Sequence, residues 1–249
     1  MTETHDDDLA SGPSHPEPHA QLAGRRWAPV AAAALLLLLV GLGLGLWLSR
    51  GNSSVTSAGP EGVAVQNVPD LASADTTMAG APVDGITCRT AADQMVKYHI
   101  HALVHIYVNG QPKRLPAGAG IAAPRLDEHL ANGLFIDNSV NGCLYWLHAH
   151  SNDGVIHVES PYKHTFTLSQ FFDVWQQSLS PDQVGPAKGT VVAYENGKRY
   201  TGNPRDIPLL PHAVIQLDVG QPAVAFQPVQ FEVNGLCGAG TQGCAASVG

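Results

Sequence analysis

The stretch YHIHALVHIYV, residues 98–108, alternates between two kinds of side chain and predicts a β-strand. Aliphatic residues occupy its even positions from 100 to 108, whereas three histidines stand at odd positions. Because successive side chains of a strand point to opposite faces, we expect the even face to pack on the core and the odd face to present the histidines. The Asn-Gly pair that follows favours a type I′ turn, and residues 112–115 are expected to form the returning strand.

A second stretch, CLYWLHAHSNDGVIHVES, residues 143–160, predicts another hairpin that carries histidines. Its Asp-Gly pair can form a two-residue turn, in which case His150 faces His157. Alternatively, residues 151–154 form a four-residue loop, and His148 faces His157 instead. Both loop lengths are even, so either register places the same four side chains on one face of the ribbon, whereas a three- or five-residue loop would separate them. These side chains are His148, His150, His157 and Glu159.

The two hairpins together predict a metal site if the strand of residues 98–108 lies beside the second hairpin. Neutral imidazole is a good ligand for zinc and copper, and a His-x-His pair on one strand face supplies two ligands at once. Glu159 would then be a ligand, a partner that orients an imidazole, or a general base on a metal-bound water. We predict a zinc or copper site formed by some of His99, His101, His148, His150 and His157.

A strand face that carries histidines also forms without a metal, through hydrogen bonds to carboxylates and backbone or as a pH-sensitive contact. His105 shares the odd strand face, and the sequence favours neither a ligand role nor a role without a metal for it. His129, His164 and His212 stand in loop-like contexts beside charged residues or prolines and are expected to be polar side chains without a metal role. The sequence has no HExxH, no GxSxG and no phosphate-binding glycine loop, so it indicates no particular enzyme class.

One helix is expected among the strands. Thr167 can cap its N-terminus with Gln170 three residues later, and an apolar stripe at helical spacing follows within residues 168–178. Residues 189–202 repeat the Asn-Gly hairpin pattern, and residues 213–219 add a further strand. The sequence therefore predicts a mainly β fold with one clear helix (α+β), in which antiparallel hairpins pack against the helix at 168–178.

Residues 27–48 contain no charged side chain and are long enough for a helix that crosses a bilayer core of about 30 Å. Arg25 and Arg26 precede this stretch, so we expect a single-pass membrane anchor with a cytoplasmic N-terminus and an extracytoplasmic C-terminal domain. A cleaved signal peptide is the alternative, and it exports the same domain. The other expected parts are a disordered cytoplasmic tail (1–26), a flexible linker (49–85), a β-rich domain (86–233) and a Gly-rich tail (234–249).

All four cysteines follow the apolar stretch, which suits an oxidising compartment where disulfides persist. Three pairings are possible, and the simplest joins Cys88 to Cys143 and Cys237 to Cys244. The net charge of −8 and the lack of a basic run argue against nucleic acid as a partner.

Four blocks occur in order along the domain: YHIHALVHIYVNG, CLYWLHAHSNDGVIHVESP, FTLSQFFDVW and NGKRYTGNPRDIPL. As a set they resemble a family of uncharacterised exported or membrane-anchored bacterial proteins that carry HxH and LHxH…GxIHxE blocks. The resemblance covers about residues 88–217. It implies an exported protein and assigns no activity.

These observations predict a membrane-anchored extracytoplasmic protein that binds zinc or copper through a histidine cluster. One alternative is an envelope interaction or structural module without a metal. The other is a metal-dependent enzyme of unknown substrate, with Glu159 as a base. The sequence favours a protein without catalytic activity.

Overall fold

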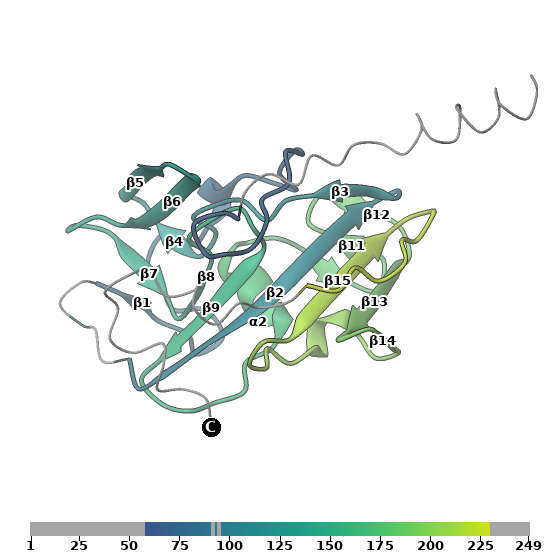
Figure 1. Ribbon diagram of the computed structural model, residues 1–249. Helices are drawn as coiled ribbons and strands as arrows, with labels where there is room; N and C mark the ends of the chain where they lie inside the picture. The colour runs from purple at the N-terminus through teal and green to yellow at the C-terminus, as the bar shows by residue number, and fades with distance from the viewer. Residues whose placement is uncertain (1–57, 91–92, 94–95, 230–249) are drawn as a thin grey trace, which may run out of the picture. The chain divides into compact units, whose positions relative to one another are not determined.

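The computed structural model describes residues 58–90, 93 and 96–229, which are coloured in Figure 1. The predicted cytoplasmic tail, the predicted membrane span at residues 27–48, the Gly-rich tail and the predicted Cys237–Cys244 pair lie outside these residues. Within the described residues, no helix has the length and apolar character needed to cross a membrane.

Strand β2 (Tyr98–Val108) lies at the centre of a seven-stranded sheet, between β15 and β9 (Figure 1). It pairs antiparallel with β9 and, near its end, with β3. Its pairing with β15 is parallel, a contact between distant segments that the sequence did not indicate. The other strands of the sheet are β3 (Gln111–Lys113), β8 (Leu147–His148), β9 (Val155–Ser160), β13 (Val191–Glu195), β14 (Lys198–Tyr200) and β15 (Val214–Val219). The predicted antiparallel hairpins are the pairs β2–β3, β8–β9 and β13–β14.

Both Asn-Gly pairs form the turns predicted for them. Asn109 and Gly110 have φ angles of 50° and 75°, and Asn196 and Gly197 have φ angles of 50° and 82°. Positive φ at both central residues is the requirement of a type I′ turn, which asparagine and glycine meet at low cost. These turns connect β2 to β3 and β13 to β14 and set their registers.

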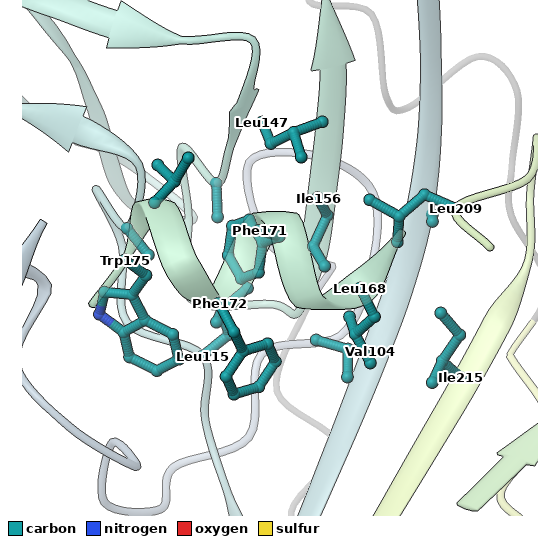
Figure 2. Close-up of a cluster of buried hydrophobic side chains, with 14 of the residues drawn as sticks. Val104, Leu115, Leu147, Ile156, Leu168, Phe171, Phe172, Trp175, Leu209 and Ile215 are labelled. Carbon is teal, nitrogen blue, oxygen red and sulfur yellow. The ribbon is translucent and has the colours of Figure 1, made fainter. Parts of the chain in front are cut away.

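The even face of β2 is the core face, as predicted. Ile100, Val104 and Ile106 are at most 4% exposed and pack with residues of α2 (Leu168–Val174). In Figure 2, Leu168 and Phe171 of α2 lie over the sheet, near Val104 of β2. The helix therefore covers one face of the sheet and leaves the histidine face on the other side of β2.

Helix α2 begins as predicted but ends earlier than residue 178. At its start, the side chain of Gln170 accepts a hydrogen bond from the backbone N–H of Thr167, at 2.9 Å. At its end, Gln176 has a φ of 55°, and the backbone N–H of Gln177 donates to the carbonyl of Phe172 at 2.9 Å. This is a Schellman-type termination, and it stops the helix while the apolar pattern continues to Trp175.

Residues 58–85 pack against the domain, so the predicted flexible linker and the predicted domain boundary at residue 86 differ from the structure. Leu71 is buried in the main core, and Val63 is buried in a smaller apolar cluster. The indole N–H of Trp175 donates to the carbonyl of Ser73 at 2.9 Å. Buried aliphatic side chains and hydrogen bonds attach this segment, and the folded domain includes it.

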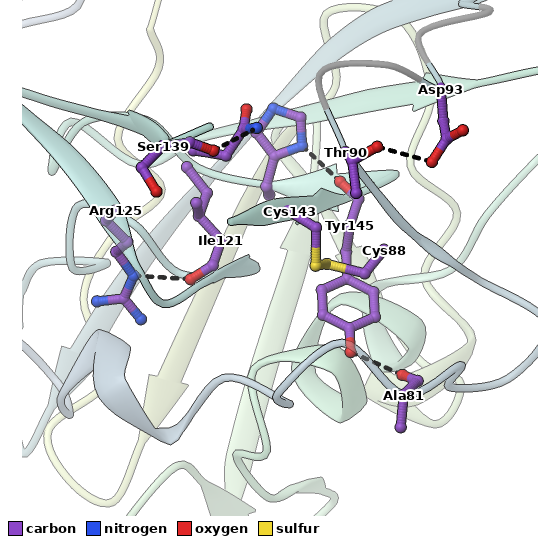
Figure 3. Close-up of a disulfide and its surroundings, with 11 residues drawn as sticks. Ala81, Cys88, Thr90, Asp93, Ile121, Arg125, Ser139, Cys143 and Tyr145 are labelled. Carbon is purple, nitrogen blue, oxygen red and sulfur yellow. Dashed lines mark hydrogen bonds between the residues drawn. A yellow bond between two sulfur atoms is a disulfide. The ribbon is translucent and has the colours of Figure 1, made fainter. Parts of the chain in front are cut away.

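Smaller sheets flank the central one. β1 (Cys88–Arg89), β7 (Cys143–Tyr145) and β4 (Ile121–Ala122) form one of them, with β7 in the middle. The predicted Cys88–Cys143 disulfide joins β1 to β7, with 5.4 Å between the Cα atoms (Figure 3). The remaining elements are β5 (Arg125–Leu130), β6 (Gly133–Asn138), β10 (Leu179–Ser180), β11 (Gln183–Val184), β12 (Ala187–Lys188) and the 3-10 turns η1 (Ala74–Thr76) and η3 (Pro204–Asp206).

Gly154 tests the loop that sets the β8–β9 register. Its φ is +93°, and a Cβ at this position would lie 2.6 Å from the carbonyl oxygen of Val104. Gly85 is a matched control, because its φ is +79° and a Cβ there meets nothing within 4 Å. We expect Gly85→Ala to cost about 1–2 kcal/mol of backbone strain and Gly154→Ala about 1–3 kcal/mol more, from the added clash. Urea unfolding followed by tryptophan fluorescence measures both, and equal losses would contradict the contact.

Candidate metal centre

Three neighbouring strands place His99, His101, His148 and His157 on one face of the central sheet, and His150 follows the end of β8. His157 of β9 faces His101 of β2 on one side and His148 of β8 on the other. Glu159 of β9 faces His99 of β2. Of the two predicted registers, the observed one is that of the four-residue loop, in which His148 faces His157. The neighbour that the metal prediction required is β2, which carries His99 and His101.

His148 and His150 are oriented by backbone carbonyl groups. Nδ1 of His148 lies 2.7 Å from the carbonyl oxygen of Tyr145, and Nδ1 of His150 lies 2.6 Å from that of Ile136. A carbonyl oxygen can only accept, so each Nδ1 carries the proton and each Nε2 keeps its lone pair. The two Nε2 atoms lie 3.0 Å apart in a buried setting. The lone pairs of these two Nε2 atoms therefore converge in the protein interior.

His157 stands between two carboxylates. Its Nε2 lies 3.3 Å from Oε1 of Glu61, and its Nδ1 lies 3.6 Å from Oε1 of Glu159. The other oxygen of Glu159 accepts a hydrogen bond from Nη2 of Arg89 at 2.8 Å. Arg89 thus orients Glu159, and Glu61 orients the ring of His157.

The side chains form two overlapping groups, each with ligand atoms within 4.8 Å of one another. His148, His150, His157 and Glu159 make the inner set, and His99, His101 and His157 make the outer set. The Nε2 atom of His99 lies 3.3 Å both from Nδ1 of His157 and from Oε1 of Glu159. All five predicted histidines and Glu159 therefore converge, and the cluster could hold a metal ion.

The pKa shifts describe a cluster that attracts one positive charge. Burial lowers the pKa of His99 to about 4 and lowers those of His101, His148 and His150 as well, so these imidazoles are neutral. Burial also opposes charge on His157, but the carboxylates of Glu61 and Glu159 outweigh it and raise the pKa of His157 to about 10.

Glu159 stays ionised within the cluster. Burial alone would raise its pKa, but the hydrogen bond from His157 and the positive charge of that ring hold it well below its usual range. Without a metal, the cation of the cluster is consequently a proton on His157. Neutral imidazoles beside ionised carboxylates are the forms that bind metal ions.

Two residues of the cluster were missed by the sequence prediction. Glu61 stands in the segment predicted as a linker, and it is only 3% exposed. Arg89 follows Cys88, and the disulfide of Cys88 to the start of the second hairpin was the one available signal that this segment lies near the site. No sequence pattern pointed to Glu61, because it comes from an irregular turn with no periodicity.

The other histidines lie outside the cluster. His129, His164 and His212 are exposed and belong to neither set of potential ligands. His105 shares the odd face of β2 but belongs to neither set of potential ligands, and its Nδ1 is buried without a hydrogen-bond partner among the described residues. The interpretation of His105 as a packed, neutral histidine therefore fits the structure better than a ligand role.

Fold and cluster define a β-rich domain with a buried histidine–carboxylate site. No family model, no curated protein and no solved structure matches the chain. The resemblance to exported bacterial proteins accordingly stays a prediction. The site must be interpreted from its own chemistry.

Burial lowers the pKa of His105 to about 4, which makes the stability of the fold depend on pH. In the unfolded chain its pKa is about 6.5. Between pH 6.5 and 4 the imidazole is therefore protonated in the unfolded state and neutral in the folded state. Acidification through this window therefore lowers stability. We expect His105→Gln to reduce that pH dependence in metal-free protein, measured as the urea midpoint against pH. The exposed control His129→Gln should keep the wild-type slope, and a wild-type slope in His105→Gln would contradict the shift.

Proposed function

We propose that this protein binds one zinc or copper ion through the inner set, His148, His150, His157 and Glu159. The observation that carries the proposal is the 3.0 Å separation of the Nε2 atoms of His148 and His150. Around a tetrahedral zinc ion with bonds of 2.0–2.1 Å, ligand atoms lie about 3.3 Å apart. Two lone pairs this close repel each other unless a cation lies between them.

The surroundings of the inner set are those of a metal site. Each of His148 and His150 donates its Nδ1–H to a backbone carbonyl, and this contact fixes the tautomer that a metal ligand needs. The side chains of Glu61 and Glu159 carry two negative charges and that of Arg89 one positive charge, so a divalent cation is balanced to within one charge. The donors are imidazole nitrogens and a carboxylate oxygen, which suit zinc and copper.

Burial favours a metal-holding role over catalysis. His148 is 0% exposed, and His150 and His157 are 7% and 5% exposed. A catalytic metal keeps a coordination position open to substrate, whereas a structural or storage site encloses the ion. We therefore place metal capture or metal-supported stability ahead of an enzyme.

For location, we propose that residues 27–48 anchor the protein in a cell membrane, with the N-terminus cytoplasmic and the metal-binding domain extracytoplasmic. The Cys88–Cys143 disulfide supports this placement, because disulfides persist in oxidising compartments. The resemblance of the sequence blocks to exported bacterial proteins supports it as well.

The metal proposal is tested on the full chain, purified without a histidine tag. We expect close to one zinc or copper ion per chain by inductively coupled plasma mass spectrometry. His150→Ala removes one of the two converging lone pairs, so it should weaken metal binding about 100-fold or more in a competition titration with a chromophoric chelator. His129→Ala, an exposed histidine outside the cluster, is the matched control and should bind as the wild type does.

The result that would overturn the proposal is a wild-type chain that contains no metal and gains no stability when zinc or copper is added. Equal metal affinity in the His150→Ala and His129→Ala proteins would overturn the assignment of the ligands. Circular dichroism of each variant separates loss of metal binding from loss of folding.

Glu61 should act on the metal through His157. Its Oε1 is 3.3 Å from Nε2 of His157, so it holds the Nε2–H and leaves Nδ1 free to bind. We expect Glu61→Gln to weaken metal affinity about 10- to 100-fold while the number of ligands seen by X-ray absorption stays the same. Glu128→Gln changes an exposed carboxylate and is the control. A loss of one ligand in Glu61→Gln would instead make Glu61 a direct ligand.

A further inference from the structure

The outer set has its own marks of a binding site. His99, His101 and His157 bring three ring nitrogens within 4.8 Å of one another. His101 is only 7% exposed, and its Nε2 has no hydrogen-bond partner among the described residues. A buried imidazole nitrogen without a partner costs free energy, and a bound cation would satisfy it. The orphaned atom therefore points to a ligand at the outer set.

The two sets differ in their access to solvent. The side chain of His99, in the outer set, is 21% exposed, whereas that of His148, in the inner set, is 0% exposed. An ion that arrives from solution consequently meets the outer set first. The inner set lies on the far side of His157, toward β8.

His157 and Glu159 connect the sets. His157 belongs to both, and Oε1 of Glu159 lies 3.3 Å from Nε2 of His99 and 4.0 Å from Nε2 of His148. An ion could exchange His99 and His101 for His148 and His150 without leaving these two side chains. No step of this exchange requires the ion to be released into solvent.

Charge and shared ligands favour one ion at a time. Two divalent ions would bring four positive charges beside Arg89, against the two carboxylates of Glu61 and Glu159. At the short distances within this cluster the ions would repel each other strongly. Both would also compete for His157.

We propose that the outer set His99, His101 and His157 is a second, weaker metal site that takes up the ion and passes it to the inner set. The inference rests on the proposed function, because it assigns a route to the same ion. The ligand class is a divalent zinc ion or a copper ion free of large chelators. His157 stays bound to the ion during the transfer, and Glu159 assists the exchange of ligands.

Zinc chloride and the full wild-type and variant chains provide the test. We expect one zinc per wild-type chain at saturation. A His148→Gln/His150→Gln protein should still bind one zinc, at least tenfold more weakly, through the outer set. His101→Ala should slow zinc uptake at least tenfold in stopped-flow mixing with a fluorescent zinc indicator, with a smaller loss of affinity than His150→Ala. His129→Ala should keep the wild-type rate.

Other results would overturn the proposed function, the outer site or the alternate occupancy of the two sets. No zinc in the wild type overturns the proposed function itself. One zinc in the wild type but none in a folded double variant overturns the outer site alone, and two zinc ions in the wild type overturn alternate occupancy. If the double variant does not fold, the uptake rate of His101→Ala decides, and a wild-type rate there overturns the uptake role.

Discussion

The antiparallel pairing of β2 with β9 is the contact on which both the core and the candidate site depend. It puts His101 opposite His157 and His99 opposite Glu159, while Ala102 stands opposite Ile156 on the other face. A shift of one residue along either strand would turn the apolar side chains toward the site and the histidines toward α2. Burial of the aliphatic face against the helix therefore also selects the register that assembles the cluster. The sheet therefore assembles the histidine cluster whenever it folds in this register.

Most of this arrangement follows from strand parity, which short-range sequence patterns reveal. The alternation in residues 98–108 and the even length of the loop before Val155 were enough to predict which histidines share a face. The parallel pairing of β2 with β15 could not be predicted, because it joins segments more than a hundred residues apart and no short-range sequence pattern signals it. The end of α2 was missed because Gln176 adopts a left-handed conformation that glycine or asparagine would normally signal.

The histidine cluster concentrates polar groups in the interior, where each unpaired group has a cost. Backbone carbonyls satisfy one nitrogen of His148 and one of His150, and Arg89 satisfies Glu159. The disulfide between Cys88 and Cys143 stands next to Arg89 and ties its strand to β7. The covalent bond thus helps to hold in place Arg89, a buried cation that fixes the carboxylate of Glu159. The sheet supplies the histidines and Glu159, whereas the disulfide-linked strand supplies the Arg89 cation that pairs with Glu159.

Glu61 reaches the cluster from outside the sheet, on the turn that also buries Val63 against Leu103 and Val155. The carboxylate and its anchor belong to a part of the chain whose composition resembles a spacer. A comparison of homologous chains that aligned only their strands would treat this segment as freely variable. The turn is instead under the same constraint as the histidines, and exchange of the sheet between chains without residues 58–66 would transfer an incomplete unit.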